Sequence, residues 1–271
     1  MKCAPRSDDR GKSLSVDENA GRGKRQPSAE TTPGRDRAGS DLARAIAAVR
    51  DPAPDIHCWW IDLAAAAHAL ALAPTWLSAA EHARAERFGT DALRRRWIAG
   101  RLALRHVLGA ALDVAPAEVA IARGARGRPF VDGAKLDFNV TNTGQVGLVA
   151  VCAAPPPDAR IGVDIERRDR RVDPDRLGRR VLTGAERERL AVLDPDTRRQ
   201  VFLRTWTCKE AMSKATGDGL SAPFRAIDVV VGEDLALAGG PAPYVPPDWS
   251  LIGLNVPADY VATLARYGPS P

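Results

Sequence analysis

Three consecutive prolines at 155–157 divide this chain of 271 residues into two parts of similar make-up. Proline cannot donate a backbone hydrogen bond, so neither a helix nor a central strand passes through such a run. Before it, residues 146–153 form a continuous apolar run typical of a buried strand, and after it residues 160–166 alternate as a strand does. Because both parts mix helical and strand patterns, we predict an α+β fold of two helix-and-sheet subdomains, 55–154 and 158–271.

Hydrophobic periodicity places the other elements. Helical spacing is clearest in two long segments, one in each half, and short apolar runs flank both of them. The expected elements are a strand at 56–63, a helix at 78–112, strands at 119–123, 136–140, 146–153 and 160–166, a helical region at 174–193, a helix at 197–215, and strands at 227–231, 250–256 and 260–265.

The N-terminal segment differs in amino-acid composition from the rest of the chain. Residues 1–50 carry eleven Lys and Arg against seven Asp and Glu, so most of the formal net charge of +5 lies there. Few of its residues are large and apolar, and we predict a disordered basic leader over residues 1–54. The remainder is nearly neutral and no aromatic residues interleave with the leader's arginines, so nucleic-acid binding is not expected as the function.

Cysteine spacing and hydropathy exclude further classes. Cys3, Cys58, Cys152 and Cys208 show no C-x-x-C spacing, so neither a zinc site nor a disulfide framework is expected. No apolar run approaches the roughly 18 residues of a membrane span, and the N-terminus has no secretory apolar segment. We therefore expect a cytoplasmic monomer that does not interact with membranes.

Two acidic motifs lie on elements that can share one metal ion. Asp164 and Glu166 alternate with apolar residues on a predicted strand, so both carboxylates face the same side. On a predicted helix, Glu210 lies one turn after Trp206 and one turn before Lys214. Magnesium prefers oxygen ligands and is usually held by a few carboxylates, water and phosphate. We therefore predict Mg²⁺, or Mn²⁺ in its place, bound by Asp164, Glu166 and Glu210.

The same motifs carry a family resemblance. They read Gly162-Val163-Asp164-x-Glu166 and Trp206-x-x-Lys209-Glu210-Ala211-x-x-Lys214. Together they resemble the signature of the 4′-phosphopantetheinyl transferases, in the Sfp-type branch that has two halves in one chain. The resemblance covers roughly residues 55–265. It implies two similar subdomains related by a pseudo-twofold axis, with the active site between them.

Weaker similarities lie upstream, in Arg84-Ala85-Glu86-Arg87-Phe88, Gly127-Arg128-Pro129 and Phe138-Asn139-Val140-Thr141-Asn142-Thr143. The first resembles the start of the family's first substrate-binding helix, and the others resemble its Gly-Lys-Pro and Phe-Asn-x-Ser-His-Ser segments. By this resemblance Arg96, Arg128, Thr141 and Asn142 would hold the 3′-phosphate and adenine end of coenzyme A. Arg128 replaces the family's usual lysine, and neutral Asn142 replaces its usual histidine.

The resemblance implies a holo-[carrier protein] synthase. Such an enzyme transfers 4′-phosphopantetheine from coenzyme A to a serine of an apo acyl or peptidyl carrier protein and releases adenosine 3′,5′-bisphosphate. The carriers serve fatty-acid, polyketide or nonribosomal-peptide biosynthesis. Lys214, assisted by Lys209, would reach the pyrophosphate. Either Glu210 or Glu186 would accept the serine proton, so the expected catalytic residues are Glu210, Lys214 and Glu186.

A second class of function is a catalytically silent module that binds coenzyme A or a carrier protein on the same scaffold. Such a module would be free to lose any of the three carboxylates, whereas this chain has all of them. The basic run 167–171 is either a solvated loop or a surface that attracts the phosphates of coenzyme A or an acidic protein partner.

Overall fold

The computed structural model describes residues 33–268, which fold into helices and antiparallel sheets. The N-terminal half contains α1 (Pro33–Arg44), β1 (Ile46–Ala53), β2 (Ile56–Asp62), α2 (Leu63–Ala66), α3 (Ala73–Trp76), α4 (Ala79–Glu86), α5 (Asp91–Leu112), β3 (Ile121–Arg123), β4 (Pro129–Val131), β5 (Leu136–Thr143) and β6 (Val146–Ala153). The C-terminal half contains β7 (Arg160–Arg167), α6 (Pro174–Val181), α7 (Gly184–Ala191), α8 (Pro195–Thr216), β8 (Asp228–Val231), β9 (Leu235–Gly239), β10 (Trp249–Gly253) and β11 (Tyr260–Tyr267). Short 3₁₀ turns complete it, among them η1 (Ala67–Leu72) and η4 (Phe224–Ala226).

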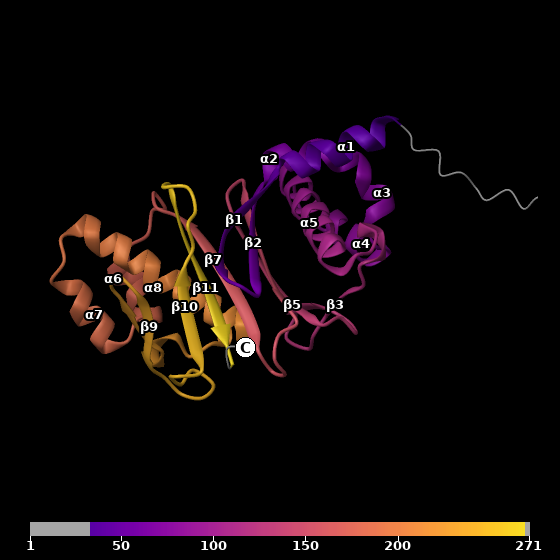
Figure 1. Ribbon diagram of the computed structural model, residues 1–271. Coiled ribbons are helices and arrows are strands. Elements are labelled where there is room, and N and C mark those ends of the chain that lie inside the picture. The colour runs from indigo at the N-terminus through magenta and orange to yellow at the C-terminus, as the bar shows by residue number, and fades with distance from the viewer. Residues whose placement is uncertain (1–32, 269–271) are drawn as a thin grey trace, which may run out of the picture. The chain divides into compact units, whose positions relative to one another are not determined.

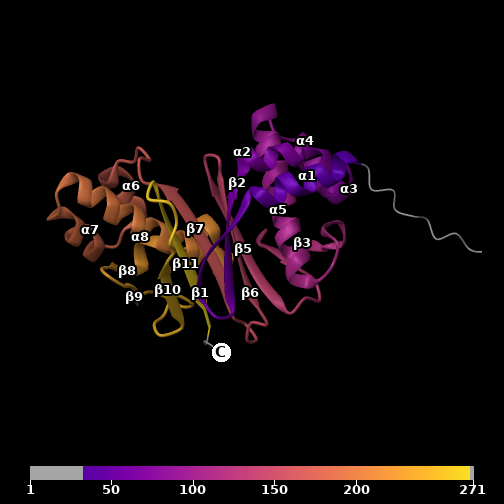
Figure 2. The ribbon, with the colours of Figure 1, turned by 45° about the horizontal axis from the view of Figure 1, so that its top comes forward.

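Two antiparallel sheets form the centre of the fold. Their strand orders are β1-β2-β6-β5 and β7-β11-β10-β9-β8, and β3 pairs with β4 in a separate hairpin. Helices α1–α5 lie on the outer side of the first sheet and α6–α8 on the outer side of the second (Figures 1 and 2). An apolar core between the sheets includes Ile56, Leu148, Val163 and Leu264. The layers therefore run helix, sheet, sheet, helix.

Helix α8 approaches β7 more closely than a side chain would allow. A Cβ atom at Gly162 would overlap the carbonyl oxygen of Ala211 and lie 2.6 Å from the backbone nitrogen of Ala215. The helix begins after Asp194, whose carboxylate accepts two backbone N–H bonds, and ends at Gly217 with φ 78°. The missing side chain at position 162 thus lets the strand lie directly against the helix.

Local caps divide the helix expected at 78–112 into α4 and α5. Ser78 and Glu81 form a capping box at the start of α4, and the Thr90 hydroxyl caps α5. The helical region expected at 174–193 is likewise two helices, because Thr183 and Glu186 form a capping box at the start of α7. Within residues 33–268, we find no helix whose length and apolar character would let it cross a membrane.

The predicted boundary of the leader at residue 54 is wrong. Residues 33–53 form α1 and β1: Ala38 and Leu42 are buried in the N-terminal core, and β1 pairs with β2. These few apolar residues form an element because η1 and the first sheet pack against them. The disorder predicted for residues 1–32 lies outside the described residues, and the subdomain bounds 55–154 and 158–271 stay predictions.

Candidate active site

Asp164 of β7 is the most buried member of the acidic set, with 5% of its surface exposed. Its Oδ1 accepts hydrogen bonds from Lys214 Nζ at 2.6 Å and from the Thr141 hydroxyl at 3.1 Å. Its Oδ2 is buried and has no hydrogen-bond partner within residues 33–268. Burial raises the pKa of the Asp164 carboxyl, although the Lys214 ammonium opposes the change.

Glu166 and Glu210 complete what we call the carboxylate cluster, Asp164, Glu166 and Glu210. Burial is the main reason that the pKa of each glutamate is raised, and the Asp164 carboxylate raises both further. Arg170 pairs with Glu166, and its guanidinium lies 5.5 Å from the centre of the Trp206 ring. The three predicted metal ligands therefore lie close enough for the Asp164 charge to affect the pKa of both glutamates.

The cluster offers oxygen donors but is not arranged as a closed metal site. Among residues 33–268, no three His, Cys, Asp or Glu side chains are grouped so that they could hold a metal ion. The unpartnered Asp164 Oδ2 and the mutual repulsion of the carboxylates are the features that fit a hard divalent cation.

A cavity of about 450 Å³ lies beside the cluster and is lined by both halves of the fold. Lys214, which contacts Asp164, is part of its wall. Of the described residues 33–268, seven Lys and Arg side chains line the cavity, and no Asp or Glu does. Four of these side chains are paired with carboxylates that do not line the cavity, so the surface that a ligand would meet is cationic and is suited to a ligand with negative charges. The cationic residues of the cavity are Arg84, Arg96, Arg101, Arg123, Arg126, Arg128 and Lys214.

The structure gathers all four residues predicted for the 3′-phosphate end of coenzyme A around this cavity. Arg96 donates to the Gly144 carbonyl at 3.1 Å and is half-buried in the cavity wall. Arg128 is more occupied: it forms a two-pronged ion pair with Asp137 at 2.8 and 2.7 Å, and it donates to the carbonyls of Lys214 and Ile161.

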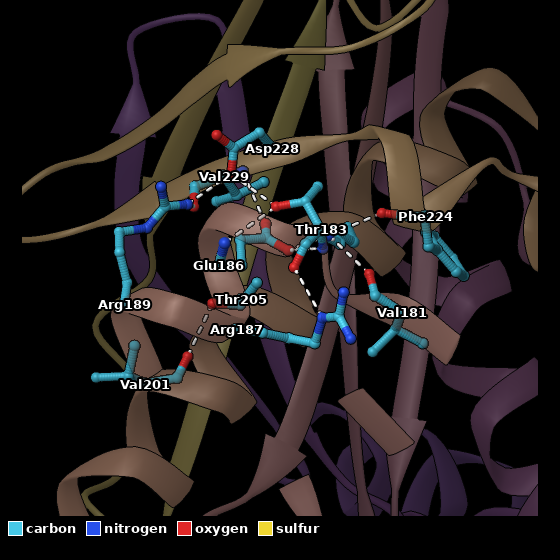
Figure 3. Close-up of polar contacts among 11 residues, drawn as sticks. Val181, Thr183, Glu186, Arg187, Arg189, Val201, Thr205, Phe224, Asp228 and Val229 are labelled. Atoms are coloured by element: carbon cyan, nitrogen blue, oxygen red, sulfur yellow. Dashed lines mark hydrogen bonds and ion pairs between the residues drawn. The ribbon is translucent and has the colours of Figure 1, made fainter. Parts of the chain in front are cut away.

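Glu186 and Lys209 do not lie at the cavity, contrary to the expected roles in proton transfer and phosphate binding. Both side chains are 1% exposed and form an ion pair at 2.5 Å inside the C-terminal half. Figure 3 shows Glu186 beside Thr183 and below Val229. Its carboxylate accepts hydrogen bonds from the backbone N–H groups of both residues. Burial lowers the pKa of the Lys209 ammonium. The pair is a structural link between helices, so both assignments are corrected.

Four cationic residues of the cavity were not among the predicted site residues, although the first lies in the segment that resembles the family's substrate-binding helix: Arg84, Arg101, Arg123 and Arg126. For Arg123 and Arg126 a signal was available, because they lie in the same β3–β4 segment as Arg128, which was predicted to bind phosphate. Arg84 stacks near Trp97, with the guanidinium carbon 6.0 Å from the ring centre. These residues make the cavity more basic than the four predicted residues alone would.

Comparison with known proteins gives consistent matches. A family model described as 4′-phosphopantetheinyl transferase superfamily matches residues 160–265, and one described as 4′-phosphopantetheinyl transferase, N-terminal, matches residues 64–155. The 4′-phosphopantetheinyl transferase HetI of Nostoc sp. is 34% identical over 220 residues, covering 79% of this chain and 88% of that protein. The 4′-phosphopantetheinyl transferase of Bacillus subtilis is 26% identical over 160 residues, covering 58% and 68% respectively. A solved holo-(acyl-carrier-protein) synthase from Bacillus anthracis in complex with CoA (3′,5′-ADP) aligns with a TM-score of 0.34 and 22% identity, over 41% of this chain and 96% of that chain.

Proposed function

Because the chain is an enzyme of the 4′-phosphopantetheinyl transferase superfamily, we propose that it transfers 4′-phosphopantetheine from coenzyme A to a serine of an apo acyl or peptidyl carrier protein. The second product would be adenosine 3′,5′-bisphosphate. One observation carries the proposal: a cavity built by both halves is lined, in the part of the chain that the structure describes, by seven cationic side chains and no carboxylate, and its Lys214 contacts Asp164. Coenzyme A, with its pyrophosphate and 3′-phosphate, matches that charge.

Lys214 is the residue that we place at the pyrophosphate. Its ammonium lies where the cavity meets the carboxylate cluster, and its side chain is 26% exposed. Negative charge on the phosphate oxygens grows and moves during phosphoryl transfer, so a fixed cation there lowers the barrier. Arg96 and Asn142 are proposed to hold the 3′-phosphate end, with Asn142 as a neutral donor.

The carboxylate cluster is proposed to hold Mg²⁺, with Mn²⁺ as a substitute. The unpartnered Asp164 Oδ2 supports this. Burial raises the pKa of all three carboxyl groups, and carboxylate repulsion raises the pKa of Glu166 and Glu210 further, so a divalent cation would stabilise their charged forms. When bound, the cation would neutralise charge on the pyrophosphate oxygens.

Glu210 is the proposed acceptor of the serine proton. Burial, and next the Asp164 carboxylate, raise its pKa, so this carboxylate takes up a proton more readily than an exposed glutamate does. We do not propose Glu186 for this role, because it is held in a buried ion pair with Lys209.

Carrier recognition is proposed to involve the basic run 167–171. Arg170 is engaged by Glu166 and Arg167 pairs with Asp169 at 2.5 Å, whereas Arg171 is exposed. A surface with several cations attracts carriers whose serine has acidic neighbours.

The test is incubation of the purified protein with coenzyme A, Mg²⁺ and a panel of apo carriers, scored by intact mass. We expect a holo mass shift on at least one carrier and none in EDTA. Asp164→Asn, Glu166→Gln and Glu210→Gln should each lower turnover by about a hundredfold or more, because each removes a charge at the reacting phosphates. Glu188→Gln, at an exposed position of α7, is the matched control and should keep full activity.

The silent-module alternative predicts a different result. A binding module would bind coenzyme A in calorimetry yet modify no carrier in the panel. Full activity in EDTA, or in any two of the three carboxamide variants, would remove the metal assignment while leaving the transfer proposal standing.

A further inference from the structure

The two sheets meet along edge strands that are not paired by their backbones. β5 ends the first sheet and β7 ends the second, and they run beside each other. Within residues 33–268, no backbone ladder joins them. An unpaired buried edge leaves N–H and C=O groups that must find other partners.

Alternate side chains of β5 supply those partners. Asp137 Oδ2 accepts the Ile161 N–H at 2.7 Å, and Asn139 Oδ1 accepts the Val163 N–H at 3.1 Å. The next side chain on the same face, Thr141, bonds to Asp164. Asp137, Asn139 and Thr141 are all buried, and we call this row the polar ladder. In a strand, a buried face is usually apolar, so a buried polar face indicates a specific task.

The carbonyl groups of β7 are satisfied at the same edge. Arg128 donates to the Ile161 carbonyl at 2.9 Å, and Lys214 Nζ donates to the Val163 carbonyl at 3.2 Å. Lys214 Nζ also donates to Thr141 Oγ1 at 2.9 Å and to Asp164 Oδ1 at 2.6 Å. Its three hydrogens are therefore all directed by groups at the boundary between the halves, so what Lys214 offers a phosphate is its positive charge rather than a further hydrogen bond.

The Thr141 hydroxyl has no hydrogen to spare for a phosphate. A hydroxyl has one hydrogen, and the Thr141 hydroxyl donates it to Asp164 while it accepts from Lys214. A contact from Thr141 to the 3′-phosphate of coenzyme A would require it to release Asp164. The geometry thus argues against the 3′-phosphate role expected from the sequence.

We infer that Asn139 and Thr141 are positioning residues: from the N-terminal half they hold the Val163 backbone and the Asp164–Lys214 pair in the geometry required for transfer. The inference rests on the proposed function for its kinetic consequence, but its contacts can be measured without it. Asn139 accepts the backbone N–H of Val163, the residue before Asp164. The Thr141 hydroxyl bonds directly to the Asp164 carboxylate and the Lys214 ammonium.

The kinetic test compares Thr141→Val, which has the same shape but no hydroxyl, with Thr141→Ser, which keeps the hydroxyl. Both are assayed with coenzyme A and with dephospho-coenzyme A. We expect Thr141→Val to lower kcat by about tenfold to a hundredfold with both substrates, as loss of a hydrogen bond to a charged group does. The ratio of kcat/KM for the two substrates should not change, and Thr141→Ser should retain most of the activity.

A role at the 3′-phosphate gives the opposite pattern. Thr141→Val would then lower kcat/KM for coenzyme A only and erase the preference over dephospho-coenzyme A, which would overturn the inference for Thr141. If the wild type modifies no carrier, the proposed function fails. Calorimetry with coenzyme A and dephospho-coenzyme A then tests whether Thr141 contacts the 3′-phosphate. Only such a contact would make Thr141→Val weaken the binding of coenzyme A more than that of dephospho-coenzyme A.

Hydrogen exchange tests the ladder independently of activity. Asn139→Leu removes the acceptor for the Val163 N–H, whereas Asn139→Asp keeps an oxygen there. We expect the Val163 amide to exchange at least about tenfold faster in Asn139→Leu than in wild type and in Asn139→Asp, because its bond is lost. The peptide 260–267, on the other edge of β7, is the internal reference. Equal exchange in wild type and Asn139→Leu would refute the ladder.

Discussion

Replacing Lys209 by methionine separates a structural lysine from a phosphate-binding one. The ammonium donates to Glu186 Oε2 at 2.5 Å and to the carbonyls of Val181 at 2.7 Å and Phe224 at 2.8 Å. These groups lie at the end of α6, in α7 and in η4, so one side chain on α8 connects three neighbouring segments. Methionine fills similar volume but removes the ammonium from Glu186 and both carbonyls; Glu186 keeps the backbone N–H bonds from Thr183 and Val229 but loses its counter-charge.

The expected cost follows from burial. Removing one partner of a buried ion pair destabilises a protein by about 3–5 kcal/mol, because the other charge stays buried and unpaired. That is a large part of a total stability of about 5–15 kcal/mol. At about 2–4 °C per kcal/mol for a chain of this size, Lys209→Met should lower Tm by about 6 to 20 °C.

Urea unfolding followed by circular dichroism measures the loss in free energy of unfolding, and thermal unfolding measures the fall in Tm. The double variant Lys209→Met/Glu186→Gln should recover part of the loss, because no charge then remains unpaired. Lys135→Met is the control, since Lys135 is exposed and its replacement should change stability by no more than about 0.5 kcal/mol. Unchanged stability of Lys209→Met together with a raised KM for coenzyme A would refute the reasoning and indicate that Lys209 binds the phosphates of coenzyme A.

Two further predictions concern protonation. The raised pKa of Asp164 means that the folded state binds this proton more tightly than the unfolded state does, so its ionisation costs stability as pH rises above about 4. In metal-free solution, the stability of Asp164→Asn relative to wild type should therefore increase from about pH 4.5 to pH 7; a flat difference in calorimetric scans would contradict the shift. Burial raises the pKa of the Cys152 and Cys208 thiols to about 12, so both should resist alkylation by iodoacetamide in the folded protein at about pH 8, and peptide mapping that found rapid labelling at either would contradict their burial.

The sequence predicted the elements whose signals are local and periodic. The strand expected at 160–166 is β7, and the helix expected at 197–215 is α8, each within two residues. The run 146–153 is β6. By contrast α1 was missed, since its buried face consists of little more than Ala38 and Leu42 and depends on tertiary packing.

Helical geometry could have excluded Lys209 from the site at once. Trp206, Glu210 and Lys214 share one face at four-residue spacing, whereas Lys209 lies about 100° away from Glu210 around the helix. Its partner Glu186 was visible as half of a capping box with Thr183. The polar ladder was not predictable in the same way, because nothing local shows that β5 faces the edge of a strand from the other half.

The close approach at Gly162 has a consequence for how this chain can vary. Ala211 and Ala215 present bare backbone to the glycine, so the three positions form one steric unit on two elements. A methyl group at position 162 would push α8 outward and carry Glu210 and Lys214 with it. A substitution at position 162 is therefore tolerated only if α8 moves away from β7. In a library that randomised position 162 alone, almost all active variants would carry glycine.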